Sequence, residues 1–163
     1  MKNKKKGFTL VELLVVIAIL AILATVSILG YTSFTKKAKD SNAQSEWSQF
    51  KNYVLAYTLN GDTFKVTSGE GESAKVYTVS FSNNDIIIVE GDYTSTAFVL
   101  EGDGATHQPA VTATIKFTTL GIDKTDDIVI KGELRKTASG MTYEVDGGSC
   151  DVTGVKVYSI KSN

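Results

Sequence analysis

A long apolar run, from Phe8 to Leu29, most constrains what this chain can fold into. It contains 22 residues, which at the rise of an α-helix measure roughly 33 Å, enough to cross the roughly 30 Å hydrocarbon core of a bilayer. The apolar centre of an ordinary secretory signal has only about 7–15 residues. We therefore predict a membrane-spanning helix over residues 8–30.

Glu12 is the single charged residue inside this run. A carboxylate inside a membrane is costly and rarely occurs without a partner. No Lys or Arg lies within one turn on its C-terminal side, so we expect no partner from the same helix. Two interpretations remain open. Either the carboxylate lies close enough to the boundary to reach the headgroups, or a positive charge from another copy of the chain pairs with it.

Charge is distributed unevenly along the chain. Four of the 17 basic residues precede residue 7, and all 18 acidic residues follow it. Without residues 1–7, the chain has 13 basic and 18 acidic residues, a net charge of 13 − 18 = −5. Nucleic-acid backbones are bound by clustered Lys and Arg, so we predict no specific nucleic-acid partner.

After Gly30 the apolar residues fall on one face of a helix. Trp47, Phe50, Val54 and Tyr57 follow one another at spacings of three or four, with polar residues between them. No proline precedes Pro109, so we predict one helix from about Phe8 to Leu59. Residues 31–59 form its amphipathic continuation. The pattern slips around Asp40-Ser41-Asn42, where a kink is an open alternative.

Residues 60–163 have the pattern of a β-rich head. Short runs rich in Val, Ile, Thr and aromatic residues alternate with Gly, Asn, Asp and Ser turns. We expect an antiparallel sheet whose apolar face is covered by the stripe from Tyr31 to Tyr57, which makes an α+β fold. The predicted strands are Lys75–Ser82, Asp85–Glu90, Thr96–Leu100, Val111–Thr118, Asp127–Glu133, Met141–Val145 and Val155–Ile160.

The stretch G-F-T-L-V-E at Gly7–Glu12, behind a short basic leader and before the apolar helix, resembles the class III signal of type IV pilins and pseudopilins. The resemblance implies that residues 1–7 are a leader removed by the prepilin peptidase between Gly7 and Phe8. The same enzyme, acting as N-methyltransferase, would then methylate Phe8. It also implies the pilin fold, and that Glu12 of one subunit pairs with the Phe8 amine of its neighbour.

The function implied by this resemblance is structural. The chain would be a single-pass protein of the cytoplasmic (inner) membrane as a precursor. It would then be a subunit of an extracellular pilus, alone or with minor pilins, serving adhesion, twitching motility or biofilm formation. The Lys-rich composition, with one Arg and one Cys, favours a Gram-positive type. A pseudopilin of a type II secretion or competence system, a membrane-anchored binding module and a conventionally secreted protein remain alternatives.

The head offers few residues for chemistry. Related pseudopilins often bind calcium in a C-terminal loop, which makes Asp146 and Asp151 the calcium candidates. No stretch matches the calcium-loop pattern, however, so ordinary turn acids are favoured. We expect His107 to be exposed in a loop and Cys150 to be a free thiol. We find no phosphate-binding loop or nucleophile elbow, and predict no cofactor and no enzyme activity.

Overall fold

The computed structural model describes residues 7–58, 63–69, 71–93, 100, 105–117, 119–121 and 132–161. The chain divides into two compact units, residues 1–37 and residues 38–163. One helix, α1 (Leu10–Thr58, 49 residues), contributes its first part to the first unit and its last part to the second.

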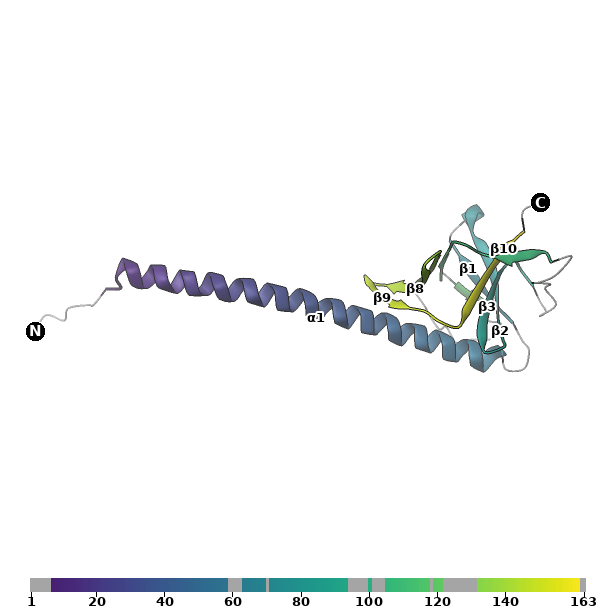
Figure 1. Cartoon of the computed structure of the whole chain (residues 1–163), viewed down its shortest axis with the longest axis horizontal. Coiled ribbons are helices and arrows are strands. Elements are labelled where there is room, and N and C mark those ends of the chain that lie inside the picture. The colour runs from purple at the N-terminus through teal and green to yellow at the C-terminus, as the bar shows by residue number, and fades with distance from the viewer. Residues whose placement is uncertain are drawn as a thin grey trace, which may run out of the picture. The chain divides into compact units, whose positions relative to one another are not determined.

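Helix α1 confirms the predicted long N-terminal helix (Figure 1). It is continuous through Asp40–Asn42, where the apolar pattern slips, so the chain keeps its helical hydrogen bonds there. The predicted stop at Asn60-Gly61 lies outside the described residues. The helix is long and apolar enough to cross a membrane, and its most apolar window of 18 residues has a mean hydropathy of 3.0.

The described part of the head contains two sheets, where the sequence predicts one. The six-stranded sheet has the order β4-β10-β3-β2-β1-β6, and the four-stranded sheet has the order β5-β7-β8-β9. A short 3-10 helix, Gly71–Ser73, precedes β2. The strands are β1 (Phe64–Ser68), β2 (Lys75–Ser82), β3 (Asp85–Glu90), β4 (His107–Pro109), β5 (Ala113–Lys116), β6 (Thr119–Gly121), β7 (Glu133–Thr137), β8 (Gly140–Val145), β9 (Gly148–Asp151) and β10 (Val155–Ile160).

The strand predictions succeed where β-branched residues dominate. Strands β2, β3 and β10 have the predicted bounds, β8 begins one residue early, and β5 is shorter than predicted. Strands β1, β4, β6 and β9 are not predicted at all. The strand predicted at Thr96–Leu100 lies outside the described residues except for Leu100. The one predicted at Asp127–Glu133 is described only at its last two residues, and the second of these begins β7.

One pairing departs from the predicted antiparallel arrangement. Strands β3 and β10 are parallel, with Val155 opposite Ile86 and Tyr158 opposite Val89. Parallel neighbours need a long connection, and the whole stretch from β4 to β9 supplies it. All other pairings are antiparallel, so the α+β prediction holds for a mixed, mainly antiparallel head.

The second part of α1 packs on both sheets and forms the main core. Ala43, Trp47, Phe50 and Val54 are buried on one helix face, at spacings of three and four. The predicted helix stripe is therefore only partly correct. Its central residues are buried, whereas Tyr31, Phe34 and Tyr57 are 70%, 72% and 38% exposed. The sheet residues in this core include Val66, Val79, Ile86, Ile88, Ile115, Leu134, Tyr143, Val145 and Val157.

The six-stranded sheet has apolar residues on both faces. Ile86 and Ile88 of β3 belong to the main core, while Ile87 and Val89 pack with Tyr158 on the opposite face. This accounts for the uninterrupted apolar run in β3, since a strand covered on both faces needs no polar alternation.

Tyr143 of β8 joins the four-stranded sheet to α1. Its ring packs against Trp47 and Phe117, with ring centroids 5.5 and 6.0 Å away, and its hydroxyl donates a hydrogen bond to Glu46 Oε2 at 3.2 Å. Burial, and then the nearby Glu46 carboxylate, raises the pKa of Tyr143, so the phenol stays protonated. Gly132 lies directly against this ring, and a Cβ at that position would overlap it.

Strand β9 also lies directly against helix α1. A Cβ on Gly148 would overlap the backbone of Lys39, and the amide of Ser149 donates to Asp40 Oδ1 at 3.0 Å. Glycine at 148 therefore permits a backbone-to-backbone approach that a side chain would prevent.

We predict that Gly132→Ala destabilises the head by about 1–3 kcal/mol, because the added methyl must displace the buried Tyr143 ring. Thermal unfolding of the detergent-solubilised chain, followed by near-ultraviolet circular dichroism, measures the change. Gly140→Ala is the matched control, since nothing lies within 4 Å of its Cβ position. Equal melting curves for the two variants would contradict the packing described here.

Candidate assembly site

The segment that precedes α1 is accessible and non-helical. Gly7, Phe8 and Thr9 have no regular secondary structure, and the Phe8 side chain is 87% exposed. Exposed backbone outside regular secondary structure is the usual place of proteolytic cleavage, and the Gly7–Phe8 bond lies in such a segment.

Glu12 is bound by Thr9, three residues before it. The Thr9 amide and hydroxyl donate to Glu12 Oε2 at 2.8 and 2.9 Å, and the Glu12 amide donates to Thr9 Oγ1 at 3.3 Å. This reciprocal arrangement is a capping box, in which residues at the N-cap and third helical positions satisfy each other's amides. It explains why the helix begins at Leu10.

The expectation that the helix offers Glu12 no partner is therefore wrong. That expectation rested on the absence of Lys and Arg, whereas the observed partner is a hydrogen-bond donor. The signal was present as T-x-x-E at Thr9–Glu12, directly before an apolar run.

The cap uses only one of the two carboxylate oxygens. All contacts from Thr9 reach Oε2, and no described residue donates to Oε1. An ionised carboxylate has about four acceptor positions, so Oε1 can accept from an external cation while the cap stays intact. Capping and pairing with a second subunit are thus geometrically compatible.

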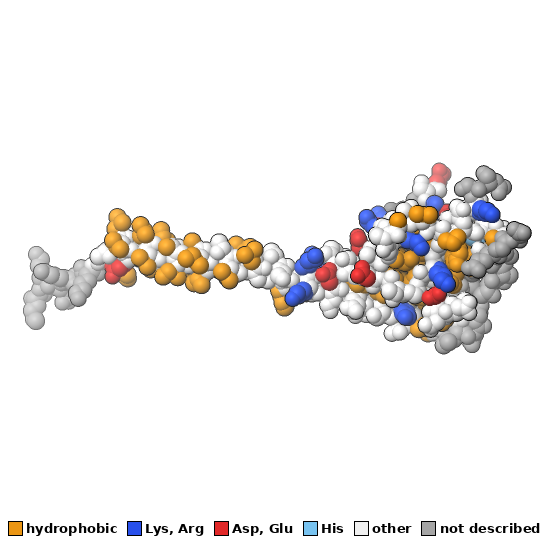
Figure 2. Space-filling model, in the orientation of Figure 1, with side chains coloured by type: hydrophobic (Ala, Val, Ile, Leu, Met, Phe, Trp, Pro, Cys, Tyr) orange, Lys and Arg blue, Asp and Glu red, His pale blue; other side chains and the backbone are white. Residues whose placement is uncertain are grey.

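Figure 2 shows apolar side chains exposed along the visible face of the helix in the first unit. Its large side chains are between 48% and 87% exposed, and an all-round apolar helix occurs in a membrane or inside an assembly. These residues are Phe8, Leu10, Val11, Leu13, Leu14, Val15, Val16, Ile17, Ile19, Leu20, Ile22, Leu23, Val26, Ile28 and Leu29.

Comparison with protein families identifies the same segment. Residues 2–28 match the family model for the prokaryotic N-terminal methylation motif. This match and the long apolar helix support a type IV pilin-like protein. Searches of curated proteins and of solved structures returned no match. The motif belongs to a structural class of proteins, and the apolar helix fits membrane anchoring of a pilin-like precursor.

In the head, the two calcium candidates lie apart. Asp146 and Gly147 form the two-residue turn between β8 and β9, with φ angles of 49° and 77°. Asp-Gly is a preferred sequence for such a turn, which accounts for Asp146. Asp151 pairs with Thr142 at the other end of the same ladder. Among the described residues, no group of three His, Cys, Asp or Glu side chains could hold a metal ion.

His107 is buried, so the prediction of an exposed loop histidine is wrong. It begins β4 opposite Ile160 of β10 and is 2% exposed. Its Nε2 lies 3.1 Å from the Glu90 carbonyl oxygen and 2.9 Å from the Tyr93 hydroxyl, and its Nδ1 lies 2.8 Å from Thr106 Oγ1. The Glu90 carbonyl can only accept, so its contact with His107 is a hydrogen bond when the ring proton is on Nε2.

Cys150 is a free thiol on β9 that packs partly against the main core. Burial raises the pKa of the thiol, which keeps it protonated and weakly nucleophilic. Its position is that of a small core residue.

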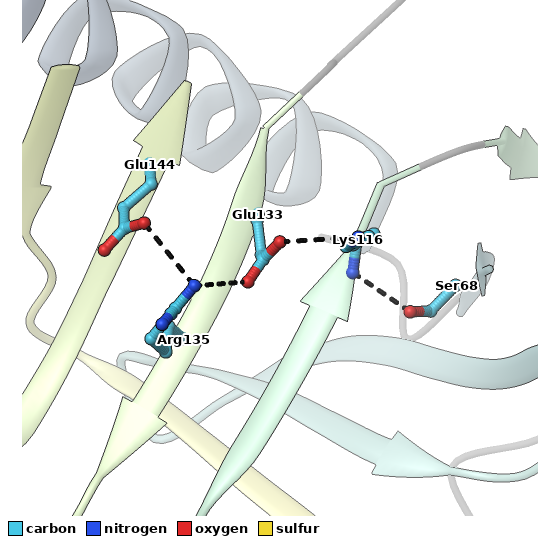
Figure 3. Close-up of polar contacts among 5 residues, drawn as sticks. All are labelled: Ser68, Lys116, Glu133, Arg135 and Glu144. Carbon is cyan, nitrogen blue, oxygen red and sulfur yellow. Dashed lines mark hydrogen bonds and ion pairs between the residues drawn. The ribbon is translucent and has the colours of Figure 1, made fainter. Parts of the chain in front are cut away.

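The exposed face of the four-stranded sheet carries a charge ladder (Figure 3). Glu133 and Glu144 are directly opposite each other on β7 and β8, a repulsive placement. Arg135 Nη2 offsets this repulsion by lying 3.0 Å from Glu133 and 3.7 Å from Glu144, and Lys116 Nζ is 4.0 Å from Glu133. The Lys116 amide donates to Ser68 Oγ of β1, so the ladder lies next to the six-stranded sheet. These groups satisfy one another and have a structural role.

We predict that Arg135→Gln lowers the free energy of unfolding by about 0.5–1 kcal/mol, because it leaves two facing carboxylates unscreened. Adding Glu144→Gln to this variant should restore the lost stability. Urea unfolding at low ionic strength measures both changes, and Lys136→Gln on the same strand is the control. A double variant no more stable than Arg135→Gln alone would refute the role given to Arg135.

Proposed function

We propose that this chain is a structural subunit of a type IV pilus. It is cut after Gly7, methylated at Phe8 and polymerised through residues 8–30 into a surface fibre for adhesion, motility or biofilm formation. The observation that carries the proposal is the capped, exposed apolar helix directly behind a matched methylation motif. The proposed partners are further copies of the chain, the prepilin peptidase/N-methyltransferase and, before assembly, the cytoplasmic membrane.

The apolar surface supports a fibre held together by helices. Outside the membrane, separation of subunits would expose the side chains of the apolar run to water, which opposes dissociation. Inside the membrane, lipid is as apolar as the helix, so this surface supplies little preference for one partner or one register. Specificity must then come from polar groups.

Glu12 is the polar group placed to set that register. Its Oε1 is unused by the Thr9 cap, and cleavage after Gly7 would create an amine on the exposed Phe8. A carboxylate and an amine in low dielectric attract each other, and either one alone is strongly unfavourable there. A subunit docked in the wrong register would leave both charges unpaired.

Processing is tested by mass analysis of the mature N-terminus. We expect the protein recovered from cells to begin at N-methylated Phe8. An intact Met1 indicates a plain membrane anchor, and a start near Thr25 indicates conventional secretion, so either result rejects the proposal. Electron microscopy of labelled cells then separates long surface fibres from the short fibre expected of a pseudopilin.

Three variants separate charge pairing from helix capping. Glu12→Ala removes the charge and the cap, Glu12→Gln removes the charge but keeps a residue that serves in a capping box, and Thr9→Ala removes the hydroxyl but keeps the charge. We expect both Glu12 variants to reduce surface fibres to the level of a strain without the protein. Cells with Thr9→Ala should retain most of their surface fibres.

Immunoblots of sheared surface fractions measure this, and leader cleavage, which should be intact in all three, is the control. Normal fibres from Glu12→Gln would show that capping suffices and that charge pairing has no role.

A further inference from the structure

A short band of aromatic and basic side chains follows the apolar run on α1. Tyr31 and Phe34 are 70% and 72% exposed, and Lys36 and Lys37 are exposed directly after them. We name these four residues the collar. All of them lie in the first unit, and the fibre proposal uses none of them.

The collar lies where the helix would leave a bilayer. Residues 10–29 measure roughly 30 Å, the thickness of the hydrocarbon core. Tyr31 and Phe34 then lie roughly 3 and 8 Å beyond the last residue of that span, and the two lysines roughly 10–12 Å beyond it. Aromatic rings concentrate at this depth, and lysine side chains can extend back to the phosphates.

The charges of the collar are available to an outside partner. Within the described part of the chain, neither Lys36 nor Lys37 makes a side-chain hydrogen bond or an ion pair. Lys36 and Lys37 follow Ser33 by three and four residues, so both lie near one side of the helix. A lysine pair next to an aromatic belt is complementary to anionic lipid headgroups.

We propose that the collar is an interfacial anchor that binds anionic phospholipid headgroups and sets the depth of the helix in the membrane. The two aromatic rings mark the edge of the hydrocarbon core and the two lysines contact lipid phosphates. This binding concerns the membrane-inserted chain and does not depend on fibre formation.

The anchor also explains how a membrane can accommodate the Glu12 carboxylate of the apolar run. Phe34 and Glu12 are separated by 22 residues, or roughly 33 Å of helix. A collar held at one boundary therefore brings Glu12 to the opposite boundary, where its carboxylate reaches water and headgroups. The open oxygen of Glu12 would then stay hydrated until a neighbouring subunit provides a cation.

The test uses the full chain with Cys150→Ala and Ser33→Cys, labelled at position 33 with an environment-sensitive fluorophore. The protein is reconstituted into vesicles of phosphatidylcholine with a minor fraction of phosphatidylglycerol. One of the two lipids carries bromine on its acyl chains near the headgroup. Because bromine quenches only at near contact, the ratio of the two quenching efficiencies measures which lipid surrounds the collar, whichever way the chain is oriented.

We expect brominated phosphatidylglycerol to quench more strongly than brominated phosphatidylcholine, with an enrichment of up to about fivefold for each lysine. The preference should weaken in high salt, which screens the lysines. The double variant Lys36→Gln/Lys37→Gln should abolish the preference for phosphatidylglycerol. The control double variant Lys51→Gln/Lys161→Gln removes two exposed lysines outside the collar and should leave the lipid preference unchanged.

Equal quenching by the two lipids in the parent protein overturns the proposal. So does a preference that survives Lys36→Gln/Lys37→Gln, since another group would then bind the lipid. Neither result bears on fibre formation, which is scored separately by the Glu12 variants.

Discussion

The rest of this structure depends on one constraint: an α-helix that is apolar around its whole circumference cannot be exposed to water. The first unit presents such a helix, and its large apolar side chains are at least 48% exposed from Phe8 to Leu29. Lipid can cover this surface, and so can copies of the same helix. A subunit that uses lipid before assembly and other subunits afterwards satisfies the constraint at both stages.

Polar groups then decide how such a helix is placed. The Thr9–Glu12 box satisfies amides at the helix start while leaving Glu12 Oε1 open. At the other end of the apolar run, the collar offers two lysines that pair with no acid in the described part of the chain. Since apolar contacts alone do not distinguish depth or register in lipid, these few polar groups determine the depth and the register of the helix.

The head shows how far sequence patterns predict a mixed fold. Strands β2, β3 and β10 are long and rich in β-branched residues, and their bounds follow from the sequence. Short strands such as β4 and β9 give no comparable signal, because three or four residues form a strand only when a neighbour pairs with them. His107 was misassigned for this reason, since pairing with β10 and contacts with Glu90 and Thr106 bury a residue that looks exposed in the sequence.

The sequence by itself determined the long helix, its apolar and amphipathic parts, the β-rich head and the motif at Gly7–Glu12, because each depends on residues that are close together in the chain. Only the tertiary structure decided the division into two sheets, the parallel β3–β10 pair and the close contacts at Gly132 and Gly148. It also separated Asp146 from Asp151, which are five residues apart but lie at opposite ends of a hairpin. These features arise from contacts between segments that are distant in the chain, and local sequence periodicity does not predict which segments will be in contact.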